Sequence, residues 1–269
     1  MENTYSSLIP NISYFKERKC STDWKLPERI IPYYDLTYII SGKIKYVIDG
    51  NPYELKEGDV IFVQKGSSRQ TFVNSNSPAH YFAFNFDYFF TTETSNTELP
   101  FPLIFSIGLD TEIINLCKQF NIIWNKTNIN NKDLIARGLF MQILHKLLNF
   151  DQSSNINFPI EDKRIRTIKN FILLNITKKI DIETLASIIN LHPIYFSAFF
   201  KKHTGMSPVD YIQKLRIHTA ESLLLTGKYN ITEVASLCGF DDPFYFSRLF
   251  KKLMGIPPST LIKNKRHST

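Results

Sequence analysis

The sequence has 269 residues, 43% hydrophobic and 14% aromatic, with 32 lysines and arginines against 25 aspartates and glutamates. This composition supplies core material for two ordinary domains and excludes a disordered chain. No stretch reaches the ~20 apolar residues of a membrane span, and residues 1–16 lack the pattern of a secretory signal. The three cysteines are far apart and lack metal-ligand spacing. We therefore expect a cytoplasmic protein without a membrane partner or a cofactor.

Residues 33–86 read as short aromatic and β-branched runs separated by turn signals such as Ser41-Gly42, Asp49-Gly50 and Glu57-Gly58. The intervals leave no room for crossover helices, so the sheet should be antiparallel, as in a sandwich or small barrel. The predicted strands are Asp35–Ile40, Lys43–Ile48, Tyr53–Leu55, Val60–Val63, Gln70–Val73 and His80–Phe86.

Two helices are predicted next, because apolar residues recur at helical spacing over 113–123 and 134–148. The second apolar stripe is broad. One side is expected to pack on the barrel, and the other either completes the same core or pairs with a second copy of the chain across residues 133–149.

A polar segment without periodicity, Asp151–Asn157, predicts an interdomain linker. The expected organisation is a domain over 1–150, a linker over 151–160 and a helical domain over 161–269. Residues 1–152 carry 15 basic and 16 acidic side chains, whereas residues 153–269 carry 17 and 9. The basic excess therefore lies wholly in the helical part, which suggests a polyanionic partner.

An internal repeat organises that part: residues 180–208 resemble residues 229–258. Capping residues, proline at the first helical position and a central turn in each copy predict two helix-turn-helix units, over about 181–204 and 230–254. Leu185, Ile188, Phe196 and Phe200, with Val234, Leu237, Phe246 and Phe250 at the matching places, are expected to form the packed side.

The outer face of each second helix is the candidate DNA-reading surface, because the major groove admits one α-helix. Arg248 is the expected base contact, since arginine can bond guanine through two hydrogen bonds, and the lysines are expected phosphate contacts. The first copy has apolar residues at the outer positions and would read thymine methyl groups or shape. The candidates are Ile194, Ser197, Ala198, Lys201, Lys202, Pro243, Phe244, Ser247, Arg248, Lys251 and Lys252.

One helix is predicted between the copies, from Ser207-Pro208 to Thr226-Gly227. About 18 residues at 1.5 Å each give a length of roughly 27 Å. Such a helix can hold two reading heads about one DNA turn, ~34 Å, apart.

Residues 162–266 resemble the AraC/XylS family of bacterial transcription regulators, on the doubled unit and on the segment ASLCGFDDPFYFSRLFKKLMGIPPSTL. The resemblance implies a two-domain α+β protein, with an N-terminal antiparallel cupin-like β-barrel with two packing helices and a C-terminal all-α domain of two helix-turn-helix motifs joined by a long helix. It also implies a homodimer that binds double-stranded promoter DNA, a small-molecule effector such as a sugar, control of carbohydrate uptake or metabolism genes, and contact with RNA polymerase in an activator.

The cupin resemblance also bears on metal binding and catalysis. Aligned on Gly42, Gly58 and Gly66, the three histidine positions of the metal-binding form hold Arg29, Ile31 and Arg69. Arginine cannot ligate a metal, so neither a metal site nor an enzyme is expected. The candidate effector contacts are Trp24, Arg29, Asp35, Tyr38, Tyr46 and Arg69; alternatively, Arg29 and Asp35 form a structural ion pair and the tyrosines are core.

Two other functions remain open on the sequence. A cupin enzyme with a DNA-tethering tail would hold a metal, and an architectural DNA binder would show little preference between promoter and random DNA.

Overall fold

The computed structural model describes residues 5, 7–73, 78–91, 98–127, 130–150 and 162–261. Contacts divide the chain into two compact units: the first comprises residues 1–27, 33–65 and 70–161, and the second 28–32, 66–69 and 162–269. The predicted linker, residues 151–160, lies outside the described residues. Within the described ranges, no helix is long and apolar enough to cross a membrane.

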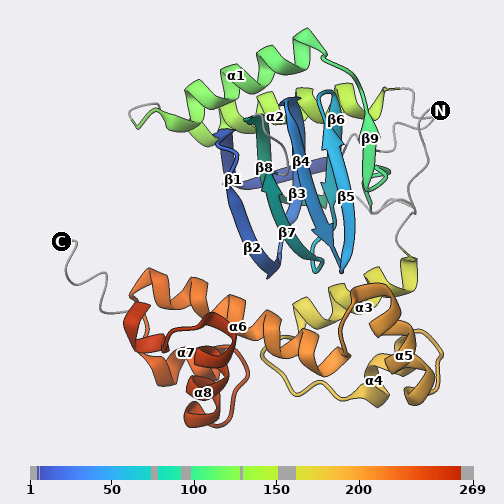
Figure 1. Ribbon diagram of the computed structural model, residues 1–269, viewed down its shortest axis with the longest axis vertical. Helices are drawn as coiled ribbons and strands as arrows, with labels where there is room; N and C mark the ends of the chain where they lie inside the picture. The colour runs from blue at the N-terminus through green and yellow to red at the C-terminus, as the bar shows by residue number, and fades with distance from the viewer. Residues whose placement is uncertain are drawn as a thin grey trace. The chain divides into compact units, whose positions relative to one another are not determined.

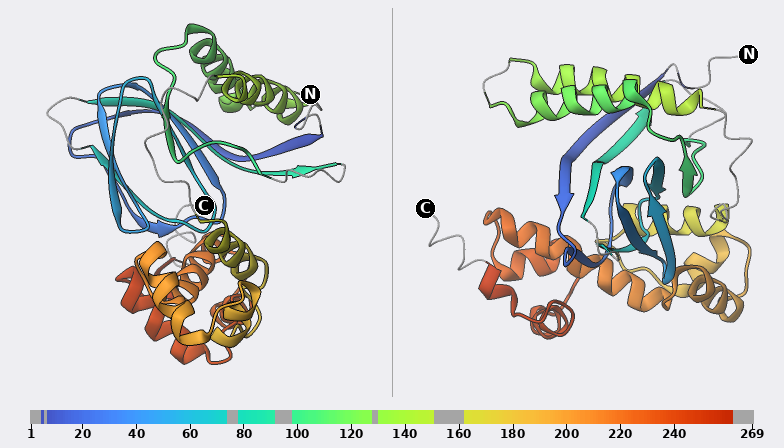
Figure 2. Two further views of the ribbon diagram at one scale, coloured as in Figure 1. Left: turned by 90° about the vertical axis from the view of Figure 1, so that its right-hand side faces the viewer. Right: turned by 45° about the horizontal axis from the view of Figure 1, so that its top comes forward.

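The N-terminal half is built from two β-sheets (Figures 1 and 2). Where pairings are defined, the strands run antiparallel, as predicted. The five-stranded sheet has the order β1 (Leu8–Cys20), β8 (Ala79–Phe90), β3 (Tyr34–Ser41), β6 (Asp59–Val63), β9 (Ile104–Ser106). The four-stranded sheet has the order β2 (Lys25–Ile30), β7 (Ser68–Val73), β4 (Lys43–Ile48), β5 (Asn51–Lys56).

Two helices, α1 (Thr111–Asn125) and α2 (Lys132–Leu148), cover one face of the five-stranded sheet (Figure 1). Phe84 of β8 lies 5.0 Å from the ring of Phe120 in α1 and 4.8 Å from that of Phe140 in α2. Because successive strand residues point to opposite faces, Leu36 and Tyr38 of β3 join this helix-facing core, whereas Asp35 and Thr37 point to the other face of the strand.

Of the nine strands in the described ranges, six were predicted: β4 with both ends as predicted and the others with ends that differ by at most four residues. Strands β1, β2 and β9 were not predicted. Strand β1 escapes prediction because its sequence, LIPNISYFKERKC, contains a proline and a run of four charged residues, and is half-buried or exposed along most of its length. The turn at Asp49 and Gly50 has φ of 50° and 83°, which is the left-handed pair that a two-residue hairpin between β4 and β5 requires.

The second unit holds six helices of the described chain, and they confirm the predicted caps. The Asp181 side chain accepts from the Thr184 N–H, and Asn230 and Glu233 form a reciprocal capping box. The helices are α3 (Lys163–Leu174), α4 (Ile182–Ile188), α5 (Pro193–Thr204), α6 (Pro208–Thr226), α7 (Ile231–Leu237) and α8 (Pro243–Met254).

The predicted connecting helix is α6, with Ser207 as its N-cap and left-handed Gly227 at its C-terminus. One packing prediction is wrong: Leu237 is 44% exposed. Val234 of α7 and the C-cap residue Cys238, one helical turn apart, are both fully buried, and this inward face leaves Leu237 outside. All three cysteines, Cys20, Cys117 and Cys238, are reduced and buried.

Candidate nucleic-acid interface

The second helix of each helix-turn-helix unit begins in the same way. His192 precedes α5 and Asp242 precedes α8, and each is followed by proline at the first helical position. The Asp242 carboxylate accepts from the Phe244 N–H at 2.8 Å, whereas the His192 Nδ1 accepts from the Ile194 N–H at 3.4 Å. A carboxylate also stabilises the positive end of the helix dipole, so α8 has the stronger cap.

The inner face of both helices is core, as predicted. Phe196 and Phe200 of α5 are fully buried, as are Phe246 and Phe250 of α8. Their aromatic packing fixes which side of each helix remains in solvent.

The outer face carries the predicted DNA candidates. Ile194 is 73% exposed and Phe244, at the matching place in α8, is 81% exposed. Also exposed are Ala198, Lys201, Lys202, Arg248, Lys251 and Lys252, whereas Ser197, Ser247 and Pro243 are half-buried.

Arg248 makes no hydrogen bond or ion pair with any other described residue, so its guanidinium is available to a partner. The Ser247 hydroxyl, in contrast, donates to the Pro243 carbonyl at 2.9 Å. Of these two neighbouring candidates, Arg248 therefore has the free donors that base recognition needs.

The predicted effector residues of the N-terminal half are not all brought together. Asp35 is fully buried and accepts from the Thr37 hydroxyl at 2.8 Å. Tyr38 lies on the opposite face of β3, where its hydroxyl donates to the Gly108 carbonyl at 2.6 Å and burial raises its pKa to about 12. Tyr46 is buried, and Trp24 is half-buried with its ring 5.8 Å from that of Tyr81.

Arg29 and Arg69 belong to the second unit, whereas Asp35 belongs to the first. The Arg29 guanidinium pairs with the Glu221 carboxylate of α6 at 2.7 Å, rather than with Asp35. Arg69 is 9% exposed. Neither arginine offers a metal ligand at the cupin histidine positions, and no cluster of histidine, cysteine or carboxylate in the described ranges could hold a metal ion.

Sequence reasoning missed the polar partners that α6 supplies inside the second unit. Next to the Arg29–Glu221 pair, the His218 Nδ1 accepts from the Ile30 N–H at 3.1 Å. Burial, with the nearby charges of Arg29 and Lys214, lowers the pKa of His218 to about 4. Lys169 of α3 is also fully buried and donates to the Ser67 hydroxyl at 3.1 Å. No local pattern marks these residues, because their partners are far away in sequence.

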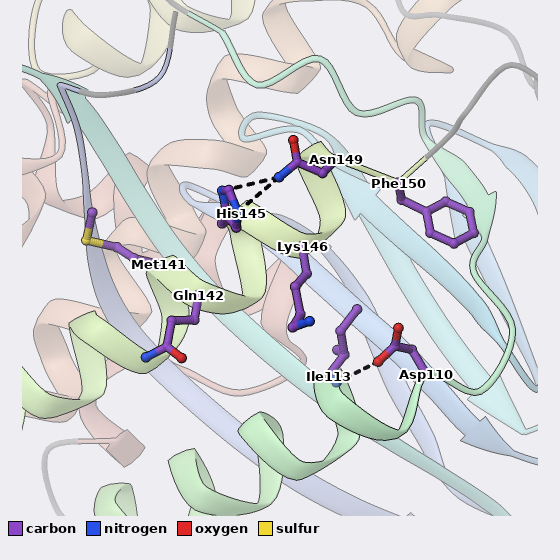
Figure 3. Close-up of a pocket in the computed structure, with 8 residues that line it drawn as sticks. All are labelled: Asp110, Ile113, Met141, Gln142, His145, Lys146, Asn149 and Phe150. Carbon is purple, nitrogen blue, oxygen red and sulfur yellow. Dashed lines mark hydrogen bonds between the residues drawn. The ribbon is translucent and has the colours of Figure 1, made fainter. Parts of the chain in front are cut away.

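The first unit also has a surface pocket of about 570 Å³ between the start of α1 and the C-terminal half of α2 (Figure 3). In Figure 3 the amide of Asn149 bonds to the ring of His145 one turn earlier. Lys146 forms an ion pair with Glu112. The lining residues are Asp110, Ile113, Met141, Gln142, His145, Lys146, Asn149 and Phe150.

Comparison with known families places a domain on each half of the chain. A helix-turn-helix domain of the AraC type matches residues 185–264. A cupin domain matches residues 31–85. The first range covers both recognition helices, and the second covers β3 to β7.

Several relatives that match over most of the chain are transcriptional activators. The lactose operon transcription activator of Staphylococcus xylosus is 24% identical over 216 residues, which cover 77% of this chain and 76% of the relative. The transcriptional activator RhaS of Mannheimia succiniciproducens is 26% identical over 248 residues, which cover 84% and 87%.

Among solved structures, ToxT from Vibrio cholerae has a similar fold. A crystal structure of ToxT aligns with a TM-score of 0.56 over 96% of this chain and 97% of its own, at 15% identity. This similarity supports the predicted fold class: an N-terminal cupin-like antiparallel domain followed by a helical region with helix-turn-helix units.

Proposed function

We propose that this chain, an AraC-type DNA-binding transcriptional regulator, reads two half-sites in duplex DNA with α5 and α8. The observation that carries the proposal is the pair of matched recognition helices, each with a buried aromatic side and an exposed basic outer face. One helix fits one major groove, and lysines at its end neutralise phosphates. The protein would act in the cytoplasm, and as an activator it would contact RNA polymerase.

The two helices should differ in what they read. Arg248 of α8 is exposed and free of partners among the described residues, so it suits a guanine, while Ala198 holds the matching place in α5. Together with exposed Ile194, Ala198 suits thymine methyl groups.

Replacing Arg248 by alanine is expected to cost about 1–3 kcal/mol at one base position, because a two-pronged arginine–guanine contact would be lost. Lys251→Ala is the matched control, one turn further along α8. It should weaken binding to all DNA sequences alike, and it should reduce the slope of log affinity against log salt concentration by ~1. Dissociation constants on operator, single-base variants and random DNA, at several salt concentrations, measure both effects. Equal losses for Arg248→Ala on operator and random DNA would contradict a base contact.

The same binding data test the architectural alternative, since a binder of that class gives similar constants on operator and random DNA. The enzyme alternative has less support, because the relatives that match over most of the chain are transcriptional regulators.

We further propose that the N-terminal half binds a sugar-like effector near Asp35. A fully buried carboxylate is costly unless it is hydrogen-bonded, and Thr37 and Asp35 together place polar groups on the face of β3 away from the helices. Buried Tyr46 and half-buried Trp24 would supply flat apolar surface. The similarity to a lactose operon activator supports a sugar. A thermal-shift screen of sugars and sugar acids on the full chain tests it, because a ligand at 100 times its Kd adds about 2.7 kcal/mol of stability.

We propose, finally, that α2 pairs with α2 of a second copy. Leu134 is 67% exposed and Met141 is 41% exposed, two turns apart on one face, with Gly138 between them. A mid-helix glycine costs roughly 0.5–1 kcal/mol relative to alanine. A side chain at Gly138 would meet open space, so packing within this chain does not require the glycine. Close approach of a second helix would explain it.

Leu134→Glu is therefore expected to convert the dimer to a monomer in sedimentation velocity, because it places a charge in the apolar contact. Leu174→Glu, at a leucine of α3 that is 83% exposed, is the matched control and should leave the dimer intact. A wild-type chain that sediments as a monomer, or a dimer that survives Leu134→Glu, would contradict this interface.

A further inference from the structure

The second unit contains two separate hydrophobic cores, one for each helix-turn-helix unit, and α6 is shared between them. The first half of α6 contributes Tyr211, Ile212 and Leu215 to the core of α3, α4 and α5. Its second half contributes Ile217, Ala220 and Leu224 to the core of α7 and α8, and no described residue belongs to both cores. Figure 1 shows α6 running from the first group of helices to the second.

We call these groups the first head (α3–α5 with the first half of α6) and the second head (the rest of α6 with α7 and α8). Without a shared core, the angle between the heads depends on the stiffness of α6 and on side chains that touch both.

Arg216 is such a side chain, at the point on α6 where one core ends and the other begins. Its Nε donates to the Ile176 carbonyl at 2.9 Å and its Nη2 donates to the Lys178 carbonyl at 2.6 Å; both carbonyls lie in the first head, between α3 and α4. Because the fork of the guanidinium is rigid, two such bonds fix its position.

The same guanidinium meets the second head at the turn between α7 and α8. A Cβ atom at Gly239 would lie 2.8 Å from the Arg216 Nη2 and 2.8 Å from the Ile176 carbonyl oxygen, so only glycine permits this approach. The Phe240 ring lies 5.7 Å from the guanidinium, within cation–π range. Arg216 therefore touches both heads at once.

A second contact ties the recognition helix itself to α6. Gln213, on the first-head half of α6, donates through Nε2 to the hydroxyl of Tyr245 at 2.8 Å, in the first turn of α8. Tyr195, at the matching place in α5, is 71% exposed, against 41% for Tyr245. The Tyr195 hydroxyl makes no corresponding hydrogen bond to another described residue.

We propose that Arg216, assisted by Gln213, is a positioning residue that fixes the distance and rotation between α5 and α8, and so makes the protein selective for the spacing of its two DNA half-sites. This inference rests on the proposed function, in which both helices read DNA. One inserted base pair moves the second half-site by roughly 3.4 Å and rotates it by roughly 35°. A rigid pair of heads cannot follow that movement, whereas a loosened pair can.

The test uses the full-length protein and two half-sites obtained by selection from random duplex DNA. Binding is measured on that DNA, on versions with one or two base pairs inserted between the half-sites, and on each half-site alone. Wild type should lose at least about tenfold in affinity per insertion, and Arg216→Ala less than about threefold, with equal affinities for single half-sites. Arg216→Lys should resemble Arg216→Ala, because the lysine ammonium lacks the planar guanidinium whose Nε and Nη2 bond the two carbonyls in a fixed geometry.

Milder variants test the same proposal in case Arg216→Ala destabilises the fold. Tyr245→Phe removes only the hydroxyl that Gln213 bonds, and it should flatten the dependence on spacing in the same direction. Tyr195→Phe is the matched control in the other head and should keep the wild-type dependence. The proposal is overturned if Arg216→Ala and Tyr245→Phe both follow the wild-type spacing profile, or if they weaken single half-sites as much as double ones. A wild-type protein with no preference for paired half-sites would overturn the proposed function as well.

Discussion

Truncating Phe250 to alanine is expected to destabilise the second head by about 3–5 kcal/mol, the usual cost of emptying a buried aromatic site. The side chain is fully buried, with its ring 5.6 Å from that of Phe246. Because the two heads share no core residue, the first head should keep its structure. Chemical denaturation followed by hydrogen exchange should show early exchange in α7 and α8 alone.

Phe200→Ala is the matched change in the first head, where the ring packs 5.7 Å from Phe196 and 5.2 Å from Tyr211. It should expose α4 and α5 and leave α8 protected. On DNA, each variant should bind with the affinity of a single half-site, read by the head that remains. If either variant unfolds both heads together in one transition, the cores are coupled and this expectation is wrong.

Acidification is expected to remove stability through His218. Its pKa is lowered to about 4 in the folded chain, chiefly by burial, and is near 6.5 in an unfolded chain. Between these values the unfolded state binds a proton that the folded state does not, so stability is complete above pH 6.5 and falls as the pH drops toward 4. Through His218 alone, the free energy of unfolding should fall by about 2 kcal/mol at pH 5 and by about 3 kcal/mol at pH 4, relative to neutral pH.

The matched variant is His218→Asn, whose amide oxygen can accept from the Ile30 N–H and does not titrate in this range. Urea unfolding at pH 7, 6 and 5 should show a steep decline for wild type and a shallower one for the variant. The pH dependence contributed by the other charged groups of this cluster is present in both proteins, so the difference between the two profiles reports His218. These groups are Glu28, Arg29, Lys214 and Glu221. Parallel pH profiles would show that another group carries the acid sensitivity.

Local signals in the sequence predicted the helical half well. Asp181, Ser207 and Asn230 mark helix starts through short side chains that accept backbone N–H groups, and Gly227 marks an end through its left-handed conformation. These interactions span three or four residues, so they are visible in the sequence. The recognition helices and their exposed faces follow from the same local rules.

Contacts between distant residues were not predictable in this way. Arg216 bonds to carbonyls about 40 positions earlier, and Arg29 pairs with a carboxylate 192 positions later. Strand β1 forms because β8 supplies its hydrogen-bond partners over its whole length, not because its own sequence alternates. One error was avoidable: Asp35 and Tyr38 are three residues apart on a strand, so alternation alone places them on opposite faces.

The labelling rates of the three buried cysteines can report local opening of the native protein. Cys238 lies in the core of the second head, whereas Cys20 and Cys117 belong to the first unit, and the described part of the first head has no thiol. Burial raises the pKa of all three thiols, so each reacts with a thiol reagent only when its surroundings open. The labelling rate of Cys238 in the native protein therefore reports how often the second head opens, without any engineered label. Bound operator DNA should slow that reaction.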